Sequence, residues 1–549
     1  MELRSEDRGA ALLRKRKLIL NKATVMEHSK ADNRFPGKTE QKKSWDNVME
    51  PARLVPVTHE PDVLVIGAGP AGIGAAVAAA RNGAKVLLVE RYGFLGGNLT
   101  AAMVNPMFTF HDIRGEQVIR GIAGEVVERL VALTASPGHV TDLTFDNASM
   151  TPFDPEGMKL LLFDMTEEAG VELLLHSVFV DAVAEDGQVR HVIIENKSGR
   201  QAIRPKFVID CSADADVVAR IGAPFEMGRA DDGALQPVTL FFRIGGIDHG
   251  LLRSWMKANR ERLKDSPTDE EIDSNRMLAF LGLSDLVKEA MQAGEYPAEA
   301  APRILMYQLP NDGQVAVNCT RLQGINGTRV EDLTRAEVAT RRQAWQVHRF
   351  LRKHVGGFEA SCIVDTGVQV GVRETRRIVG DYTMVEEDVL SSRAFPDGIA
   401  CGTFAIDIHP PDGKTQIFTG SGRAVYEIPY RSLLPQGVDN LLVAGRCISA
   451  THHAFGSVRV MATAMAIGQG AGTAAALAVN NGVSSRAINT DEVRSRLIQQ
   501  GQYLLGTSVP SLREKSLELK RTRGQGSRAG HHNPFMNPSS GMETGTASL

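Results

Sequence analysis

The chain has 549 residues, of which 43% are hydrophobic, so it is long enough for several domains and a large buried core. Its formal net charge of -3 gives no overall positive field to attract nucleic acid or an anionic membrane, and we expect it to bind neither. The five cysteines have no C-x-x-C spacing, which argues against an iron–sulfur cluster or a disulfide framework; we expect no metal site and a reducing, cytoplasmic location.

The composition of residues 1–54 predicts a disordered N-terminal extension. They mix acidic residues with the basic run RKRK at 14–17 and lack the compact apolar stretch of a signal peptide. Residues 63–80 are apolar and uncharged, but closely spaced glycines and a proline interrupt them. This pattern predicts a strand, a tight turn and a buried helix rather than a membrane span.

A βαβ unit is predicted immediately after this extension. The β-branched run 62–66 indicates a buried strand, the small residues of 71–82 a helix, and 85–90 (KVLLVE) a second strand. Gly83 is well placed to end the helix.

The turn inside this unit has the pattern G-x-G-x-x-G, which is typical of dinucleotide binding. Gly67 permits the turn, Gly69 leaves room for a phosphate, and Gly72 lets the helix approach the strand. The helix N-terminus points its N–H groups at the phosphates. Glu90, at the end of the second strand, is placed to accept the ribose hydroxyls. The predicted contacts from this unit are Gly67, Gly69, Pro70, Ala71, Gly72 and Glu90.

Alternating strands and helices follow, and their pattern changes near residue 230. The first group contains a predicted helix at 159–169 and strands at 171–183, 188–196 and 206–210. The second group contains strands at 239–245 and 314–319, a helical stretch at 251–299 and an amphipathic helix at 333–354. A buried strand is then predicted at 440–444 and a long Ala/Gly-rich helix at about 460–480. These two segments resemble the buried strands of the first group and the small-residue helix of the βαβ unit. Gly468, Gly470 and Gly472 fall inside the helix at about 460–480, which indicates helix packing rather than a second fingerprint.

The segment after Glu90 resembles the glutathione-reductase-type FAD domain. In that type a Gly-Gly loop, here within RYGFLGGN at 91–98, passes close to the pyrophosphate and flavin. NLLVAG at 440–445 resembles the second flavin motif, although many relatives have Asp where this chain has Arg446. The resemblance implies FAD and adds the predicted contacts Arg91, Gly96, Gly97, Asn98, Gly445 and Arg446. Because no single histidine occupies an obvious position for covalent attachment, we expect the FAD to be noncovalent.

Longer stretches resemble the bacterial FAD-dependent oxidoreductase family, which is distantly similar to fumarate reductase flavoproteins and to the flavoprotein part of heterodisulfide reductase. Among them are FDPEGMKLLLFDMTEEAGVELLLH, GVRETRRIVGDY and YEIPYRSLLPQGVDNLLVAGRCISATHHAFGSVRVM. The resemblance spans about residues 61–500. It implies hydride transfer between FAD and a small organic substrate, for which an anionic compound is one option, with an electron acceptor that the sequence does not identify.

We therefore predict an α/β fold: a three-layer Rossmann-like FAD-binding domain with an inserted α+β substrate domain. The expected ranges are 55–230 and 425–485 for the discontinuous FAD domain, 231–424 for the substrate domain, 486–523 for a C-terminal helical segment and 524–549 for a disordered tail. A homo-oligomer is compatible with the sequence.

The candidate catalytic residues follow the second flavin motif. His452 or His453 is placed to take a substrate proton, and Arg459 to contact the flavin or a substrate carboxylate. Arg373 and Arg376, with Arg377, form a basic cluster suited to carboxylates, although an ion-pair cluster with Glu374 explains it equally well. Weaker candidates are Asp407, His409, His111 and Asp112.

Other functions remain open from the sequence alone. The first is a flavoprotein that reduces an unsaturated acid. The second is a tRNA-associated flavin-binding protein, against which the near-neutral charge argues. The third is an FAD-binding scaffold without catalysis.

Overall fold

The computed structural model describes residues 48–145, 147–410, 417–419 and 425–505 of the chain. The predicted N-terminal extension up to residue 47, the last part of the predicted helical segment (506–523) and the predicted tail at 524–549 lie outside the described residues. The described residues from Arg53 onward belong to one compact unit, so the predicted boundaries between FAD domain and substrate domain stay predictions.

A five-stranded parallel sheet forms the centre of the fold, as the βαβ pattern predicts. Its strand order is β22 (Leu441–Val443), β10 (Phe207–Asp210), β2 (Val63–Ile66), β3 (Val86–Val89) and β6 (Glu172–Leu174). Strand β10 pairs with β2 on one side and β22 on the other, which brings residues more than 200 positions apart into one sheet. Strands β2, β3 and β22 are apolar throughout, as expected for a sheet covered on both faces, whereas β10 ends in Asp210 and β6 begins with Glu172.

Alternate residues of these strands enter two different cores, which makes the fold three-layered. Val63 and Val65 pack among the helices, whereas Leu64 and Ile66 pack toward a second, four-stranded sheet. The helices are α2 (Pro70–Arg81), α3 (Ile122–Ala132), α4 (Pro155–Glu168), α12 (Met461–Asn481) and α13 (Thr490–Gln499). The second sheet contains β1 (Val57–His59), β9 (Gly199–Ile203), β8 (Gln188–Asn196) and β7 (Val178–Glu185), and α5 (Asp216–Arg220) packs beside it.

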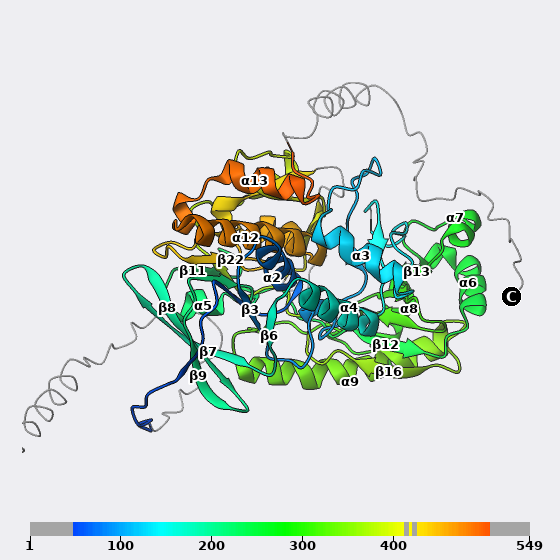
Figure 1. The fold of residues 1–549 in the computed structure, drawn as a ribbon. Helices are drawn as coiled ribbons and strands as arrows, with labels where there is room; N and C mark the ends of the chain where they lie inside the picture. The colour runs from blue at the N-terminus through cyan, green and yellow to red at the C-terminus, as the bar shows by residue number, and fades with distance from the viewer. Residues whose placement is uncertain (1–47, 146, 411–416, 420–424, 506–549) are drawn as a thin grey trace, which may run out of the picture. The chain divides into compact units, whose positions relative to one another are not determined.

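Helices α2 and α12 lie side by side (Figure 1), and glycines set their separation. A Cβ on Gly468 would lie 2.0 Å from the Ala71 carbonyl oxygen, and a Cβ on Gly472 would lie 2.1 Å from that of Ala75. On the facing helix, a Cβ on Gly74 would lie 2.2 Å from the Met465 carbonyl oxygen. Helix packing is therefore the role of the glycines in α12, as the sequence indicated.

Residues 231–424 lie in the chain between strands β10 and β22 of the parallel sheet and are called the inserted region below. This region contains a five-stranded antiparallel sheet with its own core. The order is β13 (Ala279–Gly282), β14 (Ile304–Gln308), β15 (Val315–Val317), β12 (Phe242–Gly245) and β16 (Cys362–Thr366). Its helices are α6 (His249–Ala258), α7 (Asp269–Ser274), α8 (Ser284–Gln292) and α9 (Val330–His354). The prediction of an all-helical stretch at 251–299 is wrong at β13, a short apolar run whose strand character comes from pairing with β14. The predicted strand 171–183 is likewise two strands, β6 and β7, in different sheets.

Short elements join these two regions. Two-stranded pairs form between β4 (Met107–Phe108) and β5 (Met150–Thr151), β11 (Phe225–Met227) and β17 (Arg376–Ile378), β18 (Gly398–Gly402) and β21 (Tyr426–Pro429), and β19 (Ile406–Ile408) and β20 (Ile417–Thr419). Helices α10 (Glu386–Leu390) and α11 (His452–Val458) pack together. Within the described ranges one helix, α12, is long and apolar enough to cross a membrane, and 94% of that apolar stretch is buried inside the protein.

The close approach of α2 and α12 predicts a strong and position-specific effect of a single methyl group. Gly468→Ala forces the helices apart and should lower the free energy of unfolding by about 1–3 kcal/mol, the usual cost of overpacking. Gly124→Ala in α3 is the matched control, because its Cβ would meet only a side-chain atom at 3.4 Å, so helix propensity should stabilise it slightly. Urea unfolding of the two variants measures the difference, and equal stabilities would contradict this account of the packing.

Candidate functional site

The carboxyl ends of the parallel strands bring the predicted cofactor residues to one edge of the sheet. Gly67 directly follows β2, Glu90 follows β3, Ser212 lies just beyond β10 and Gly445 just beyond β22. Ligands of open α/β sheets bind outside this edge, where the helices present their N-termini. The topology therefore unites segments that the sequence separates by more than 350 residues.

The glycine turn is packed tightly at two positions and open at the third. A Cβ on Gly67, whose φ is +94°, would lie 2.6 Å from the Cys211 carbonyl oxygen, and a Cβ on Gly72 would lie 1.8 Å from the Gly67 carbonyl oxygen. A Cβ on Gly69 would meet no atom within 4 Å. The protein itself thus needs Gly67 and Gly72, whereas the space beside Gly69 is left for a ligand, as close approach of a pyrophosphate requires.

The first turn of α2 also fits an anion. The helix begins at Pro70, and its N-cap residue Gly69 offers no side chain to cap the first amides. Those N–H groups and the positive end of the helix dipole are suited to phosphate oxygens.

Glu90 is buried at the carboxyl edge of the sheet and accepts a hydrogen bond from the glycine turn. Its Oε2 accepts from the Ala68 N–H at 2.8 Å, and its Oε1 accepts from the Tyr92 N–H at 3.0 Å. A carboxylate has about four acceptor positions, so these two bonds leave capacity for ribose hydroxyls. The neighbouring Arg91 donates to Gln369, and its predicted contact with the cofactor stays a prediction.

The Gly-Gly loop lies directly against the glycine turn. The Gly96 N–H donates to the Ala68 carbonyl at 2.8 Å, and a Cβ on Gly97 would lie 2.8 Å from the Gly69 Cα. Both glycines have positive φ, at 112° and 52°. Asn98 belongs to the short 3-10 helix Gly97–Leu99 that follows. The approach of this loop to the turn agrees with the arrangement that the resemblance implied.

Arg446, after the second motif, is bonded by the protein. Its Nη2 donates to Asp214 Oδ1 at 2.6 Å and its Nη1 to Thr375 Oγ1 at 3.0 Å. Arg376 reaches the same loop, where its Nε donates to the Asp214 carbonyl at 2.6 Å and its Nη2 to Asp216 Oδ1 at 2.5 Å. Burial, with the charges of Asp214 and Asp210 next, raises the pKa of Asp216 to about 6.

Sequence reasoning did not select Asp214 and Asp216. The available signal was their position directly after a buried strand of the sheet, in CSADAD at 211–216. Arg376 therefore lies at the cofactor edge, not beside Arg373 in a carboxylate site; the guanidinium of Arg373 donates instead to the Pro237 carbonyl at 2.7 Å. The predicted roles of both arginines in catalysis stay predictions.

A buried His–Glu–Arg chain lies next to this edge. His452 Nδ1 is 2.9 Å from Glu374 Oε1, which also pairs with Arg377. All three side chains are at most 8% exposed, and a buried charge of this kind is stable only when paired. His453, by contrast, is half exposed and lies 3.5 Å from Glu386. The structure thus separates the two candidate histidines: one is held inside and the other faces solvent.

Asp407 is the centre of a second polar group. It accepts from Arg459 Nη2 at 3.1 Å and pairs with His409 Nε2 at 3.2 Å. Burial lowers the pKa of His409 to about 4, with Asp407 opposing the shift and Arg373 and Arg459 adding to it. His409 is therefore neutral near pH 7.

Gln236 connects the two polar groups. The backbone N–H of Gln236 donates to Glu374 Oε2 at 3.2 Å, and its side-chain Oε1 accepts from the backbone N–H of His409 at 3.2 Å. No pattern in the sequence marked this residue, because an isolated glutamine belongs to no motif. The weaker candidates at 111 and 112 lie elsewhere, in contact with Ser149 and Arg114 respectively.

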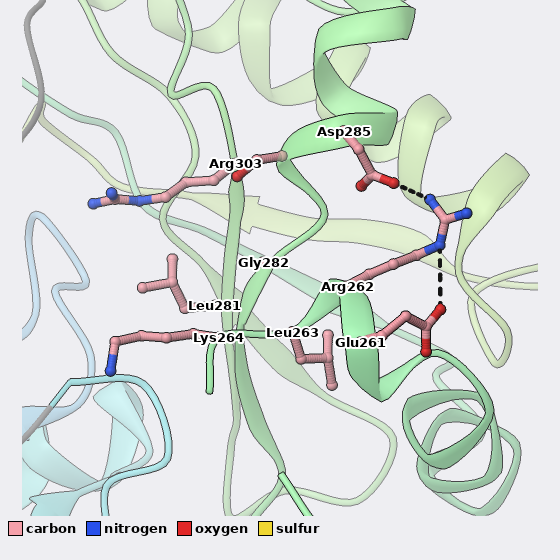
Figure 2. Close-up of a pocket in the computed structure, with 9 residues that line it drawn as sticks. Glu261, Arg262, Leu263, Lys264, Leu281, Gly282, Asp285 and Arg303 are labelled. Atoms are coloured by element: carbon pink, nitrogen blue, oxygen red, sulfur yellow. Dashed lines mark hydrogen bonds and ion pairs between the residues drawn. The ribbon is translucent and has the colours of Figure 1, made fainter. Parts of the chain in front are cut away.

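A cavity of about 700 Å³ lies in the inserted region, and it contains none of the predicted site residues (Figure 2). Arg262 pairs there with Asp285 and approaches Glu261, whereas the side chain of Arg303 points away from this group. Its lining shares no residue with the cofactor edge.

Comparisons with known proteins support FAD as the cofactor. The family model "FAD dependent oxidoreductase" matches residues 62–497. Thiamine thiazole synthase of Aeropyrum pernix is 28% identical over 193 residues, which is 32% of this chain and 63% of that protein. The alpha chain of sarcosine oxidase from a Corynebacterium species is 37% identical over 98 residues, 18% of this chain and 9% of that protein. The matches thus span less than two thirds of either relative.

Two solved structures have partial similarity. A geranylgeranyl bacteriochlorophyll reductase-like protein of Thermoplasma acidophilum aligns with a TM-score of 0.38 and 12% identity over 84% of this chain and 97% of that one. The p-nitrophenol 4-monooxygenase of Pseudomonas putida aligns with a TM-score of 0.41 and 12% identity over 87% of this chain and 96% of that one.

The open space at Gly69 predicts that folding and cofactor binding can be separated. Gly69→Val should fold, because its backbone is extended and its Cβ meets no protein atom, but the side chain should block the pyrophosphate and abolish FAD loading. Gly72→Val is the contrasting variant and should fail to fold. Circular dichroism and the FAD released on denaturation provide the two readouts. Normal flavin content in folded Gly69→Val would refute this placement of the phosphates.

His409 predicts a specific dependence of stability on pH. Its pKa falls from 6.5 to about 4 on folding, so between these values the unfolded chain binds more protons and stability decreases as pH falls. His409→Gln should remove up to about 1.4 kcal/mol of this loss per pH unit. Comparing urea unfolding of wild type and variant from pH 7 to pH 4 isolates this residue from the other titrating groups. Parallel stability curves would contradict the prediction.

Proposed function

The chain belongs to the FAD-dependent oxidoreductase family, and we propose that it transfers a hydride between FAD and a small organic acid. The observation that supports this reaction is the position of a buried, carboxylate-held histidine beside the cofactor edge. In the chain His452 lies between Gly445, where an added Cβ would lie 3.1 Å from Ala71 of α2, and Met461, where α12 begins.

The residues present fit FAD. The glycine turn and the first amides of α2 would hold the pyrophosphate, and Glu90 would bind the adenosine ribose. The Gly96–Gly97 loop packs on the same turn and would lie along the cofactor. FAD, when bound, supplies the hydride acceptor; the chain has to bind the substrate, orient it and move its proton.

His452 is the residue best placed to move that proton. Glu374 engages its Nδ1, which fixes the ring and leaves Nε2 as the nitrogen for a substrate hydroxyl or amine. Helix α11 carries Phe455 one turn further on, and the guanidinium groups of Arg377 and Arg459 lie 5.6 and 6.0 Å from that ring. The helix thus positions the histidine beside a residue that can bind an acid.

Reduction of an unsaturated acid is the second candidate. The arginine at 459 would bind the acid in either direction, and a protonated His452 would then deliver a proton rather than accept it. The two candidates differ in whether the substrate or the flavin begins reduced.

We expect His452→Ala to slow flavin reduction about 10²–10⁴-fold, the usual size of general-base catalysis, while FAD stays bound. His453→Ala is the matched control and should leave the rate unchanged, because that ring faces solvent. Rapid mixing under anaerobic conditions, with a carboxylic acid first identified by its bleaching of the flavin, measures the rates.

Imidazole should partly restore the rate of His452→Ala, which a purely structural role would not allow. An unchanged rate in His452→Ala would remove this residue from the mechanism, and flavin loss without rescue would assign it to the fold.

A further inference from the structure

Arg373 lies within the electrostatic influence of three other arginines and of Asp407, which pairs with one of them, Arg459. The pKa of Arg373 falls to about 9, first because of burial and then because of the charges of Arg459, Arg321 and Arg303, with Asp407 opposing them. The pKa of Arg321 is also lowered, by burial and by Arg303. Burial of several like charges is unfavourable unless a further anion compensates them.

Two donor nitrogens of Arg321, on the side of the guanidinium group that can bind a carboxylate, make no hydrogen bond within the described residues. Its Nε and Nη2 are buried and have no hydrogen-bond partner in the described chain, whereas its backbone is fixed by two bonds to Gln343. These two N–H groups form one parallel pair of donors on the guanidinium. Two other arginines of this protein use the same pair on a carboxylate: Arg229 on Asp232, and Arg243 on Asp365.

Two further donors near this group lack partners. Gln236 is 1% exposed, and its Nε2 has no hydrogen-bond partner in the described residues, although its Oε1 and its backbone N–H are both bonded. Arg459 Nε is also buried and unbonded there, while its Nη2 binds Asp407. A buried donor without a partner is unfavourable, so a set of them indicates a missing acceptor.

The strand pairing places Arg321 and Arg373 on the same side of the inserted region. Val238 pairs with Leu322 on one side, and Thr239 pairs with Gly371 on the other. Arg321 precedes the first partner by one residue, and Arg373 follows the second by two. Side chains alternate along extended chain, so both arginines share the face of Thr239.

We infer that Arg321, Arg373, Arg459 and Gln236 form the binding site for a carboxylate of the substrate. This inference rests on the proposed function and names the group by which the acid is recognised. A planar carboxylate matches the parallel Nε and Nη2 donors of Arg321 and reduces the excess positive charge. The donors are covered in this structure, so their covering side chains move when the anion enters.

Binding to the FAD-loaded protein tests the site without requiring turnover. The probes are acetate, succinate and benzoate, each compared with its uncharged amide, and the readouts are calorimetric titration and thermal stability. At least one carboxylate should bind and raise Tm, and its amide should not. Arg321→Lys keeps the charge but loses the paired donors, so it should weaken carboxylate binding about 10-fold or more.

Arg229→Lys is the matched control, because it loses the same paired donors at a pair with Asp232 and should bind the carboxylate as wild type does. Absence of binding by every carboxylate, equal binding of the amides, or wild-type affinity in Arg321→Lys would overturn the inference. Tighter binding of inorganic phosphate than of every carboxylate would overturn the carboxylate assignment. If carboxylates bind but none reduces the flavin, the site stands and the proposed reaction fails.

Discussion

The close approach of backbone to backbone at α2 is the constraint on which the rest of this structure depends. Gly67 and Gly72 at its start, and Gly468 and Gly472 of α12 along its side, leave no room for side chains. Because Gly468 and Gly472 carry no side chains, α12 can pack directly on the backbone of α2. Residues 441–481 therefore belong to the same layered unit as the N-terminal βαβ segment. Strand β22 then completes the sheet beside β10, and the loop between β22 and α12 is held at the cofactor edge.

That loop also carries His452 and Arg459, which pair with buried acidic residues. It runs from Gly445 through α11 to the start of α12, and it meets the inserted region at Glu374 and Asp407. The buried charges there are unevenly compensated. Glu374 has Arg377 and His452 as partners, whereas Arg373 feels the charges of three other arginines with Asp407 opposing them. Removing one partner of a buried ion pair is costly, because it leaves an uncompensated charge in the interior.

The two polar groups are linked rather than independent. Gln236 bonds the backbone of His409 with its side chain and Glu374 with its own backbone. The two groups therefore share a hydrogen-bond partner that is almost completely buried. Networks of this kind resist partial disruption, because each lost bond leaves a buried donor or acceptor without a partner.

The sequence by itself determined the parts whose signal is local. β-Branched residues, glycines and small residues predict the strand, turn and helix at 62–82. In the structure the strand and the helix begin and end within one or two positions of the predicted bounds. The long helix α12 and its packing role were equally readable, and the resemblance correctly indicated FAD and the α/β fold. Only the tertiary structure decided which charged residues meet. Arg373 and Arg376 are three positions apart yet reach different partners, and Asp214 meets an arginine 232 positions away. Such pairings depend on which strands become neighbours and which face each side chain takes. Both are decided by long-range packing, which no local pattern encodes.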